Sequence, residues 1–358
     1  MKNMGFRWFG PDNDPISLSN IRQIPGTTQV VGALTDISVG EVWPQDRIEE
    51  LKKQINSAGL KFEVVESVNI HDDIKIGLPS RDQYIENYKQ TIKNLAQSGI
   101  KVICYNFMPI FDWTRTTLKY PLADGSNVMA FEQNKVATES PEAIIEMVQN
   151  GDNHYYLPGW EPERLEKVKQ LFKAYQGVDE QKLRDNLKYF LDAVIPTCEK
   201  YDVRLAIHPD DPPRPLFGLP RIYKNQDDML KILEMNESKY NGFTICTGSL
   251  GENPRNDVPA IIRKFVPEGR VPFVHVRNIK FLNAEGDFRE SAHWSPEGSL
   301  DMFEIMKALH DTSYSGYIRP DHGRNIWGED GRPGYGLYDR ALGSSYLTGL
   351  WEAIDKQN

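Results

Sequence analysis

The stretch "GYIRPDHGR", Gly316 to Arg324, begins like an apolar, aromatic strand and ends in an arginine, an aspartate and a histidine. Seven other short runs share its enrichment in Val, Ile and aromatic residues. Together the eight runs cover Gly5–Gly10, Val30–Ile37, Lys61–Val68, Lys101–Phe107, Arg204–Pro209, Gly242–Gly248, Val271–Asn278 and Gly316–His322. Longer segments of helical period separate them, and this alternation predicts a parallel sheet.

Clear helix signals mark the intervening segments. One candidate opens on Pro44 and stops at Gly59, and another begins at a cap-like Ser80 and stops at Gly99. Further candidates cover residues 180–201, 225–235, 258–265, 299–311 and 340–354. Eight strand–helix units predict an α/β fold of the TIM type, a closed (β/α)8 barrel. A doubly wound open sheet is the main alternative, but the G-x-G-x-x-G turn typical of it is absent.

Composition restricts the class of protein. The 358 residues are predicted to form a single barrel domain, since such barrels often reach this size. A net charge of -9 argues against nucleic acid as a partner. We expect no membrane partner, because no apolar run is long enough to span a bilayer. Three widely spaced cysteines do not suggest a disulfide framework, so we expect a cytoplasmic protein.

One long segment interrupts the alternation. Residues 110–178, after the fourth strand, far exceed the usual loop between a strand and a helix. The segment contains a possible helix over residues 140–149 and the motif "HYYLPGW" over 154–160. At the C-terminal face of a barrel, we expect such an insertion to act as a lid or substrate wall or as a subunit contact; the alternative is a simple elaboration of the fold.

Metal-competent side chains end the last four predicted strands: His208, Cys246, His275 and Asp321. Any one of them could be structural on its own. Neighbouring strands lie about 4.8 Å apart, however, so four groups at adjacent strand ends can converge on one ion. Two imidazoles, a thiolate and a carboxylate suit a divalent metal such as Zn, Fe or Mn.

Several motifs spread over the chain resemble those of the mannonate dehydratase family. They are "FRWFG" (6–10), "YNFMPIFDWTRT" (105–116), "HPDDPP" (208–213), "CTGS" (246–249), "HVRN" (275–278), "RPDHGR" (319–324) and "RPGYGLYDRALG" (332–343). The resemblance implies a metal-dependent dehydration of D-mannonate to 2-dehydro-3-deoxy-D-gluconate and water, in hexuronate (glucuronate) catabolism. It also implies a homodimer and an Mn²⁺ or Fe²⁺ ion bound by His208, Cys246, His275 and Asp321.

Dehydration next to a carboxylate needs a base for the α-proton and an acid for the departing hydroxyl. His322 directly follows Asp321, and we expect it to be an acid–base residue; the alternative is that it orients Asp321. Tyr335 lies between Gly334 and Gly336, which suggests a bent loop that presents the phenol. Tyr335 could equally be a packing aromatic, and the residues do not decide which of the two gives the proton.

A polyhydroxylated anion also needs hydrogen-bond donors. Arg7 at the end of the first strand could bind a carboxylate bidentately. Other candidates for contact with the sugar acid are Trp8, Asn106, Trp113, Arg115, Arg277, Asn278 and Arg319.

Two alternatives remain open. A xylose-isomerase-like sugar isomerase or epimerase would share the barrel, the divalent ion and the ligands at the strand ends. A non-catalytic protein with a structural metal would instead have four protein ligands and no open position. Incubation with aldoses against aldonates separates the isomerase from the dehydratase, and a crystal soaked with an aldonate tests the structural metal.

Overall fold

Eight parallel strands close into a barrel in the structure, a computed structural model that describes residues 3–136 and 162–357. Each strand pairs with the strands before and after it round the barrel, and β12 pairs with β1 to close it. The barrel strands are β1 (Met4–Arg7), β2 (Thr27–Gly32), β3 (Lys61–Glu66), β4 (Val102–Tyr105), β7 (Arg204–Ile207), β8 (Asn241–Cys246), β9 (Phe273–Val276) and β12 (Tyr317–Pro320). All eight predicted strands and the predicted closure are therefore confirmed.

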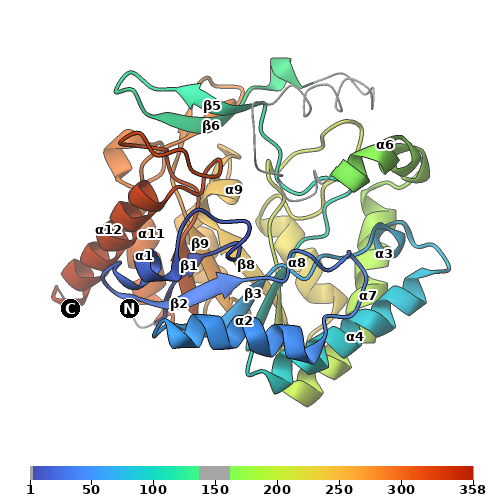
Figure 1. The fold of residues 1–358 in the computed structure, drawn as a ribbon. Coiled ribbons are helices and arrows are strands. Elements are labelled where there is room, and N and C mark those ends of the chain that lie inside the picture. Colours follow the sequence, from blue (N-terminus) through green and yellow to red (C-terminus); the bar gives the residue numbers. More distant parts are fainter. Residues whose placement is uncertain (1–2, 137–161, 358) are drawn as a thin grey trace.

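Helices surround the barrel (Figure 1). Those predicted from the sequence are α2 (Gln45–Ser57), α4 (Arg81–Gln97), α7 (Glu180–Tyr201), α8 (Gln226–Met235), α10 (Val258–Phe265), α11 (Met302–Asp311) and α12 (Leu337–Asp355). Helix α7 shows why such segments are helical: it buries residues at helical spacing, among them Leu183, Leu187 and Leu191. An aspartate, Asp179, caps it by accepting from the backbone N–H of Lys182.

Several elements escaped prediction, most of them because they carry too few residues to show a period. They are α1 (Leu18–Arg22), α3 (Asp72–Ile76), α6 (Pro162–Ala174), α9 (Thr247–Gly251) and the 3₁₀ turns η1 (Gln133–Lys135) and η2 (Ser295–Glu297). The bounds predicted for the second strand, Val30–Ile37, were shifted toward the C-terminus. Strand β2 begins at Thr27 and leaves the sheet after Gly32, and the residues that follow line a cavity instead.

A second, four-stranded sheet was not predicted. It joins the insertion strands β5 (Thr117–Pro121) and β6 (Asn127–Phe131) to β10 (Ile279–Phe281) and β11 (Phe288–Glu290), in the order β10-β11-β6-β5. All its neighbouring strands are antiparallel. In Figure 1 the β5–β6 hairpin lies along the upper edge, on the side of the barrel where α9 follows β8. The insertion is thus tied to the segment that follows β9.

Part of the insertion lies outside the described residues. These parts include the predicted helix over 140–149 and the "HYYLPGW" motif. Within the described ranges, no helix is long and apolar enough to cross a membrane.

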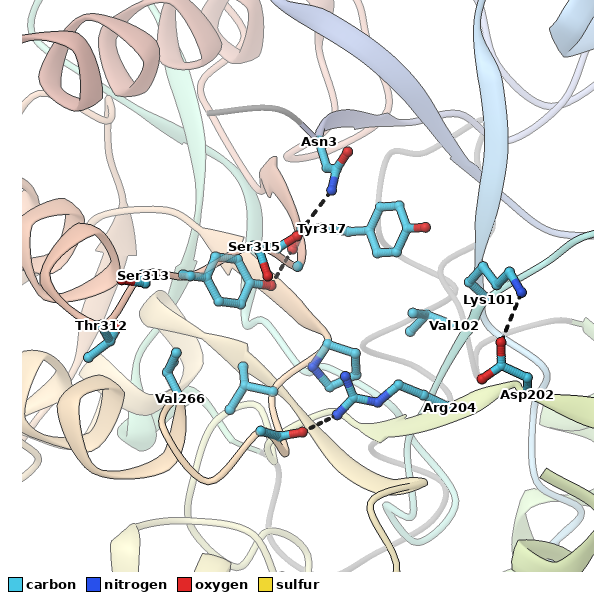
Figure 2. Close-up of a pocket in the computed structure, with 15 residues that line it drawn as sticks. Asn3, Lys101, Val102, Asp202, Arg204, Val266, Thr312, Ser313, Ser315 and Tyr317 are labelled. Carbon is cyan, nitrogen blue, oxygen red and sulfur yellow. Dashed lines mark hydrogen bonds and ion pairs between the residues drawn. The ribbon is translucent and has the colours of Figure 1, made fainter. Parts of the chain in front are cut away.

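The barrel has a cavity at each end. The cavity at the carboxyl ends of the strands, here called the mouth, measures about 1050 Å³. The cavity at the amino ends, here called the floor, measures about 340 Å³ and is lined by residues that begin β4, β7 and β12 (Figure 2). The sequence prediction placed the chemistry at the mouth, the usual location in this fold.

Candidate active site

Strand register brings the predicted metal ligands to one level of the barrel. Cys246 ends β8 and lies opposite His275 on β9, and His275 lies opposite Arg319 on β12. His208 directly follows β7, and its ring centroid lies 5.0 Å from that of His275. One ligand atom from each of His208, Cys246 and His275 lies within 4.8 Å of the other two. The structure therefore brings together three of the four predicted ligands.

The fourth predicted ligand, Asp321, lies beside this group. Its Oδ2 is 3.4 Å from the Cys246 thiol and 3.9 Å from Nδ1 of His275. Arg319 donates to Oδ1 at 2.7 Å, and Arg277 donates to Oδ2 at 3.1 Å. Burial acts to raise the pKa of Asp321, but His322 and the arginines hold that pKa well below its usual range. The carboxylate is therefore ionised at neutral pH.

These residues have the properties of a cation site. Nε2 of His275 is buried without a hydrogen-bond partner, although it lies 3.2 Å from Oε2 of Glu66. A buried polar atom without a partner is the kind of position that a bound ion can satisfy. Two imidazoles, a thiol and an adjacent ionised carboxylate suit a divalent ion of borderline softness. The residues present therefore fit the metal that the sequence predicted.

Glu66 was missed by the sequence prediction. It is the last residue of β3, and its carboxylate binds the Arg319 guanidinium through two hydrogen bonds, at 2.8 and 3.1 Å. Glu66, Cys104 and His275 form a second group whose ligand atoms lie within 4.8 Å of one another. Applying the strand-end rule to the third strand, as to the last four, would have identified Glu66.

The two predicted acid–base residues are in contact. Nε2 of His322 lies 3.0 Å from the Tyr335 hydroxyl, and both residues line the mouth. Nδ1 of His322 lies 3.0 Å from Oε1 of Glu290. Because an ionised carboxylate only accepts, the Nδ1 proton belongs to His322, and Nε2 is free to accept from the phenol. Burial and nearby Asp321 raise the pKa of Tyr335 above its ordinary value, so the phenol keeps its proton at neutral pH.

The loop that carries Tyr335 depends on Gly334, as the sequence suggested. Gly334 has φ +76°, in the left-handed region that favours glycine. A Cβ there would collide with Met129 and would come within 3.2 Å of the His322 ring. Any larger residue would push the loop away from His322.

Four predicted substrate contacts line the mouth: Arg7, Asn106, Trp113 and Arg319. Arg7 stacks on the Phe9 ring at 4.1 Å, and Trp113 meets His322 edge-on at 5.5 Å. The cavity also includes His208, Asp321, His322 and Tyr335. A sugar acid in the mouth would therefore reach the metal-competent group and the acid–base pair at once.

The other four predicted contacts have structural positions. Trp8 lies in the main core and donates to the carbonyl of Ile16 at 2.9 Å. The Asn278 side chain accepts from the backbone of Ile279 and Leu300. Arg115 and Arg277 are fully buried in a cluster of charges, defined here as the ionic cluster, with Asp211, Glu252 and Glu290. These four side chains are engaged in contacts within the protein, and their assignment as substrate contacts stays a prediction.

The ionic cluster pairs buried groups of opposite charge. Arg277 binds Asp211 and Glu252 at 2.8 Å each and Glu290 at 2.9 Å. Burial and the neighbouring Asp211 raise the pKa of Glu252 well above its usual range, although Arg115 and Arg277 act to lower it. Each of the two guanidinium groups thus contacts all three carboxyl groups of the buried cluster. Gly248 makes room for it, because a Cβ there would collide with the Arg277 side chain.

The comparison with protein families agrees with this geometry. The family model for D-mannonate dehydratase (UxuA) matches residues 1–358. This chain belongs to the D-mannonate dehydratase family.

Relatives of the mannonate dehydratase family match over nearly their whole length. The chain is 59% identical over 354 residues to a mannonate dehydratase of Lactococcus lactis subsp. cremoris, covering 99% of each chain. It is 58% identical over 351 residues to that of Thermotoga maritima, covering 98% of this chain and 97% of the relative. A crystal structure of mannonate dehydratase from Streptococcus suis serotype 2 has a TM-score of 0.89 and 43% identity, covering 100% of this chain and 96% of that chain.

A more distant structure supports the fold alone. A xylose isomerase-like TIM barrel protein from Mycobacterium smegmatis has a TM-score of 0.54 and 14% identity, covering 99% of this chain and 98% of that one. The predicted xylose-isomerase-like barrel is thus confirmed as an architecture.

Proposed function

We propose that this chain converts D-mannonate to 2-dehydro-3-deoxy-D-gluconate and water, with a divalent ion bound by His208, Cys246, His275 and Asp321. The observation that carries the proposal is the shared mouth. The metal-ligand atoms of His208, Cys246 and His275 lie within 4.8 Å of one another. They lie next to the hydrogen-bonded pair of His322 and Tyr335, at a cavity large enough for a six-carbon acid. Membership of the mannonate dehydratase family names the substrate.

The metal ligands divide into two kinds. His275 and Cys246 are fully buried, whereas His208 is only partly buried and lines the mouth. His208 and Asp321 would therefore be the ligands that border the cavity. When bound, the cation would supply Lewis-acid stabilisation of negative charge on the carboxylate end of the substrate.

The chain's own residues would bind the anion and move the protons. Arg7, which lines the mouth, supplies a guanidinium for a carboxylate or hydroxyl group. Nε2 of His322 accepts the proton from C2, and the C3–O bond breaks as the Tyr335 hydroxyl protonates the departing oxygen, releasing water. The retained phenol proton and the Nδ1–H bond to Glu290 favour this division of roles. The enol product then becomes the 2-keto acid by protonation at C3.

Other features of the proposal follow from the family and the sequence. The ion is Mn²⁺ or Fe²⁺, the active species is a homodimer, and the reaction belongs to hexuronate catabolism. The cytoplasm is the proposed location, supported by the free thiols of Cys104, Cys198 and Cys246. The single barrel domain carries the 110–178 insertion as a lid or subunit contact.

A product assay on the metal-reconstituted protein tests the reaction class. The proposal expects a 2-keto acid from D-mannonate, and neither isomerisation nor epimerisation of aldoses. Interconversion of aldoses without action on D-mannonate would favour the sugar isomerase alternative. A folded, metal-bound protein inactive on both would favour a structural metal.

A further inference from the structure

The ionic cluster contacts the acid–base pair at one point, Glu290. This residue ends β11, and its Oε1 accepts from Nδ1 of His322 at 3.0 Å. The His322 ring then meets the Tyr335 hydroxyl through its other nitrogen, also at 3.0 Å. The three side chains therefore form a continuous chain of hydrogen bonds from the cluster to the mouth.

Glu290 is itself held rigidly. Arg115 donates to Oε1 at 2.7 Å from one side, and Arg277 donates to Oε2 at 2.9 Å from the other. Burial alone would raise the pKa of Glu290, but Arg277 and Arg115 lower it to about 2. A carboxylate fixed on both oxygens presents a permanent acceptor to His322 in a single orientation.

The insertion supplies this support. Arg115 lies in the segment after β4, just before β5, and β11 is hydrogen-bonded to the insertion strand β6. The register places Phe288 of β11 opposite Phe131 and Arg289 opposite Ala130. Glu290 is thus positioned by backbone pairing with the insertion and by a side chain from its beginning.

We propose that Glu290 is a positioning residue for the dehydration. It fixes the His322 ring with the proton on Nδ1, so that Nε2 faces the reacting carbon and Tyr335. The described part of the insertion, through β6 and Arg115, is then a support for the acid–base pair. This inference rests on the proposed function, because it assigns His322 as the proton acceptor.

Glu252 offers a matched control in the same cluster. It is also fully buried and binds both Arg115 and Arg277, at 3.1 and 2.8 Å. The His322 ring bonds to Glu290 and Tyr335, so a change at Glu252 alters the cluster without removing either hydrogen bond. Comparing E290Q with E252Q therefore separates the contact with His322 from the burial of a carboxyl group.

The test measures kcat, KM for D-mannonate, bound metal and the urea midpoint in both metal-loaded variants. A glutamine at 290 must turn its NH₂ group toward His322 or toward an arginine, so the fixed acceptor is lost. We expect E290Q to lose roughly 10- to 100-fold in kcat relative to E252Q, with KM and metal content within about threefold. A kcat within threefold of E252Q would overturn the proposal. So would a loss of kcat that comes with an equal loss of bound metal.

A second pair of variants keeps a carboxylate at each of the two positions. E290D retains a carboxylate between the arginines but withdraws it from Nδ1 of His322, and E252D is its control. If E290Q does not fold, E290D is expected to show the same selective fall in kcat, and full activity of E290D would overturn the proposal. Wild-type protein that does not act on D-mannonate would instead refute the proposed function itself.

Discussion

The two ends of the barrel hold similar charged residues in different environments. At the floor, Lys101 lies 3.1 Å from Asp202, and both side chains are more than half exposed (Figure 2). At the mouth, Arg319 binds Glu66 and Asp321 with about 1% of its side chain exposed. An exposed pair gains little, because water screens both charges, whereas a buried charge that loses its partner is strongly destabilised.

The charged side chains at the mouth are buried and paired with one another, unlike the exposed pair at the floor. The floor cavity has basic and acidic residues at the strand starts, but its Arg204 guanidinium is bound to the backbone carbonyl of Gly269. The mouth instead has carboxylates, arginines, imidazoles and a thiol in mutual contact. We infer that substitutions at the mouth change chemistry, and that substitutions at the floor change little.

The largest expected effect is at Asp321. D321A removes a carboxylate that is bonded to Arg319, Arg277 and the Cys246 thiol. We expect turnover of D-mannonate to be abolished and metal binding to weaken, with the fold kept because Arg319 retains Glu66 and Arg277 retains Glu290. Activity and metal content are the measurements, with far-ultraviolet circular dichroism as the check on folding. Intact turnover in D321A would rule out its role as a ligand.

The next effect concerns the acid–base pair. H322Q and Y335F each remove one proton-transfer group while keeping most of the side-chain volume. We expect kcat to fall by roughly 10² to 10⁴ in each, the usual contribution of such a group. Metal content should stay at the wild-type level, unlike in D321A. Near-normal kcat in Y335F would reduce Tyr335 to a packing role against Phe9, whose ring lies 4.9 Å away.

Lowering the pH should reduce the contribution of the buried ionic cluster to the free energy of unfolding. The pKa of Glu290 is lowered from 4.5 to about 2, so its stabilising contribution is present above about pH 4.5 and is lost as pH falls toward 2. We expect the free energy of unfolding to fall over this range less steeply in E290Q than in the wild type. Urea unfolding at several pH values measures this, with D202N at the floor as the exposed comparison. Equal slopes for E290Q and the wild type would contradict the assigned pKa.

The smallest effect is at Lys101. K101A breaks only the exposed pair with Asp202, so we expect a loss of about 0–1 kcal/mol in the free energy of unfolding. Values of kcat and KM should remain at the wild-type level. A large loss of activity in K101A would show that the contrast between the two ends is wrong.

The sequence predicted the barrel well, because each strand and helix carries its own period and end signals. The approach of His208, Cys246 and His275 was also predictable, since neighbouring parallel strands end at one edge. His322 and Tyr335 were paired as acid–base candidates, and the structure places them in contact, although the residues alone left Tyr335 equally open to a packing role.

The features that the sequence did not predict depend on contacts between segments that lie far apart in the chain. Strand β11 has three residues and no readable period, yet its pairing with β6 places Glu290 beside His322. Trp8 follows Arg7, and successive strand residues point to opposite faces, so the core position of Trp8 was not evident from the strand end alone. Arg115 and Arg277 resembled substrate ligands because their carboxylate partners lie far away along the chain.

One measurement tests the central claim that a divalent ion at the mouth, beside His322 and Tyr335, enables loss of water from D-mannonate. The protein would be stripped of metal, and Mn²⁺, Fe²⁺ or Zn²⁺ would be returned in fractional equivalents while the 2-keto acid product is followed. The account predicts that the stripped protein is inactive and that activity with the working ion rises linearly and saturates at one equivalent per chain. Full activity of the stripped protein, or no product with any ion despite binding, would contradict it.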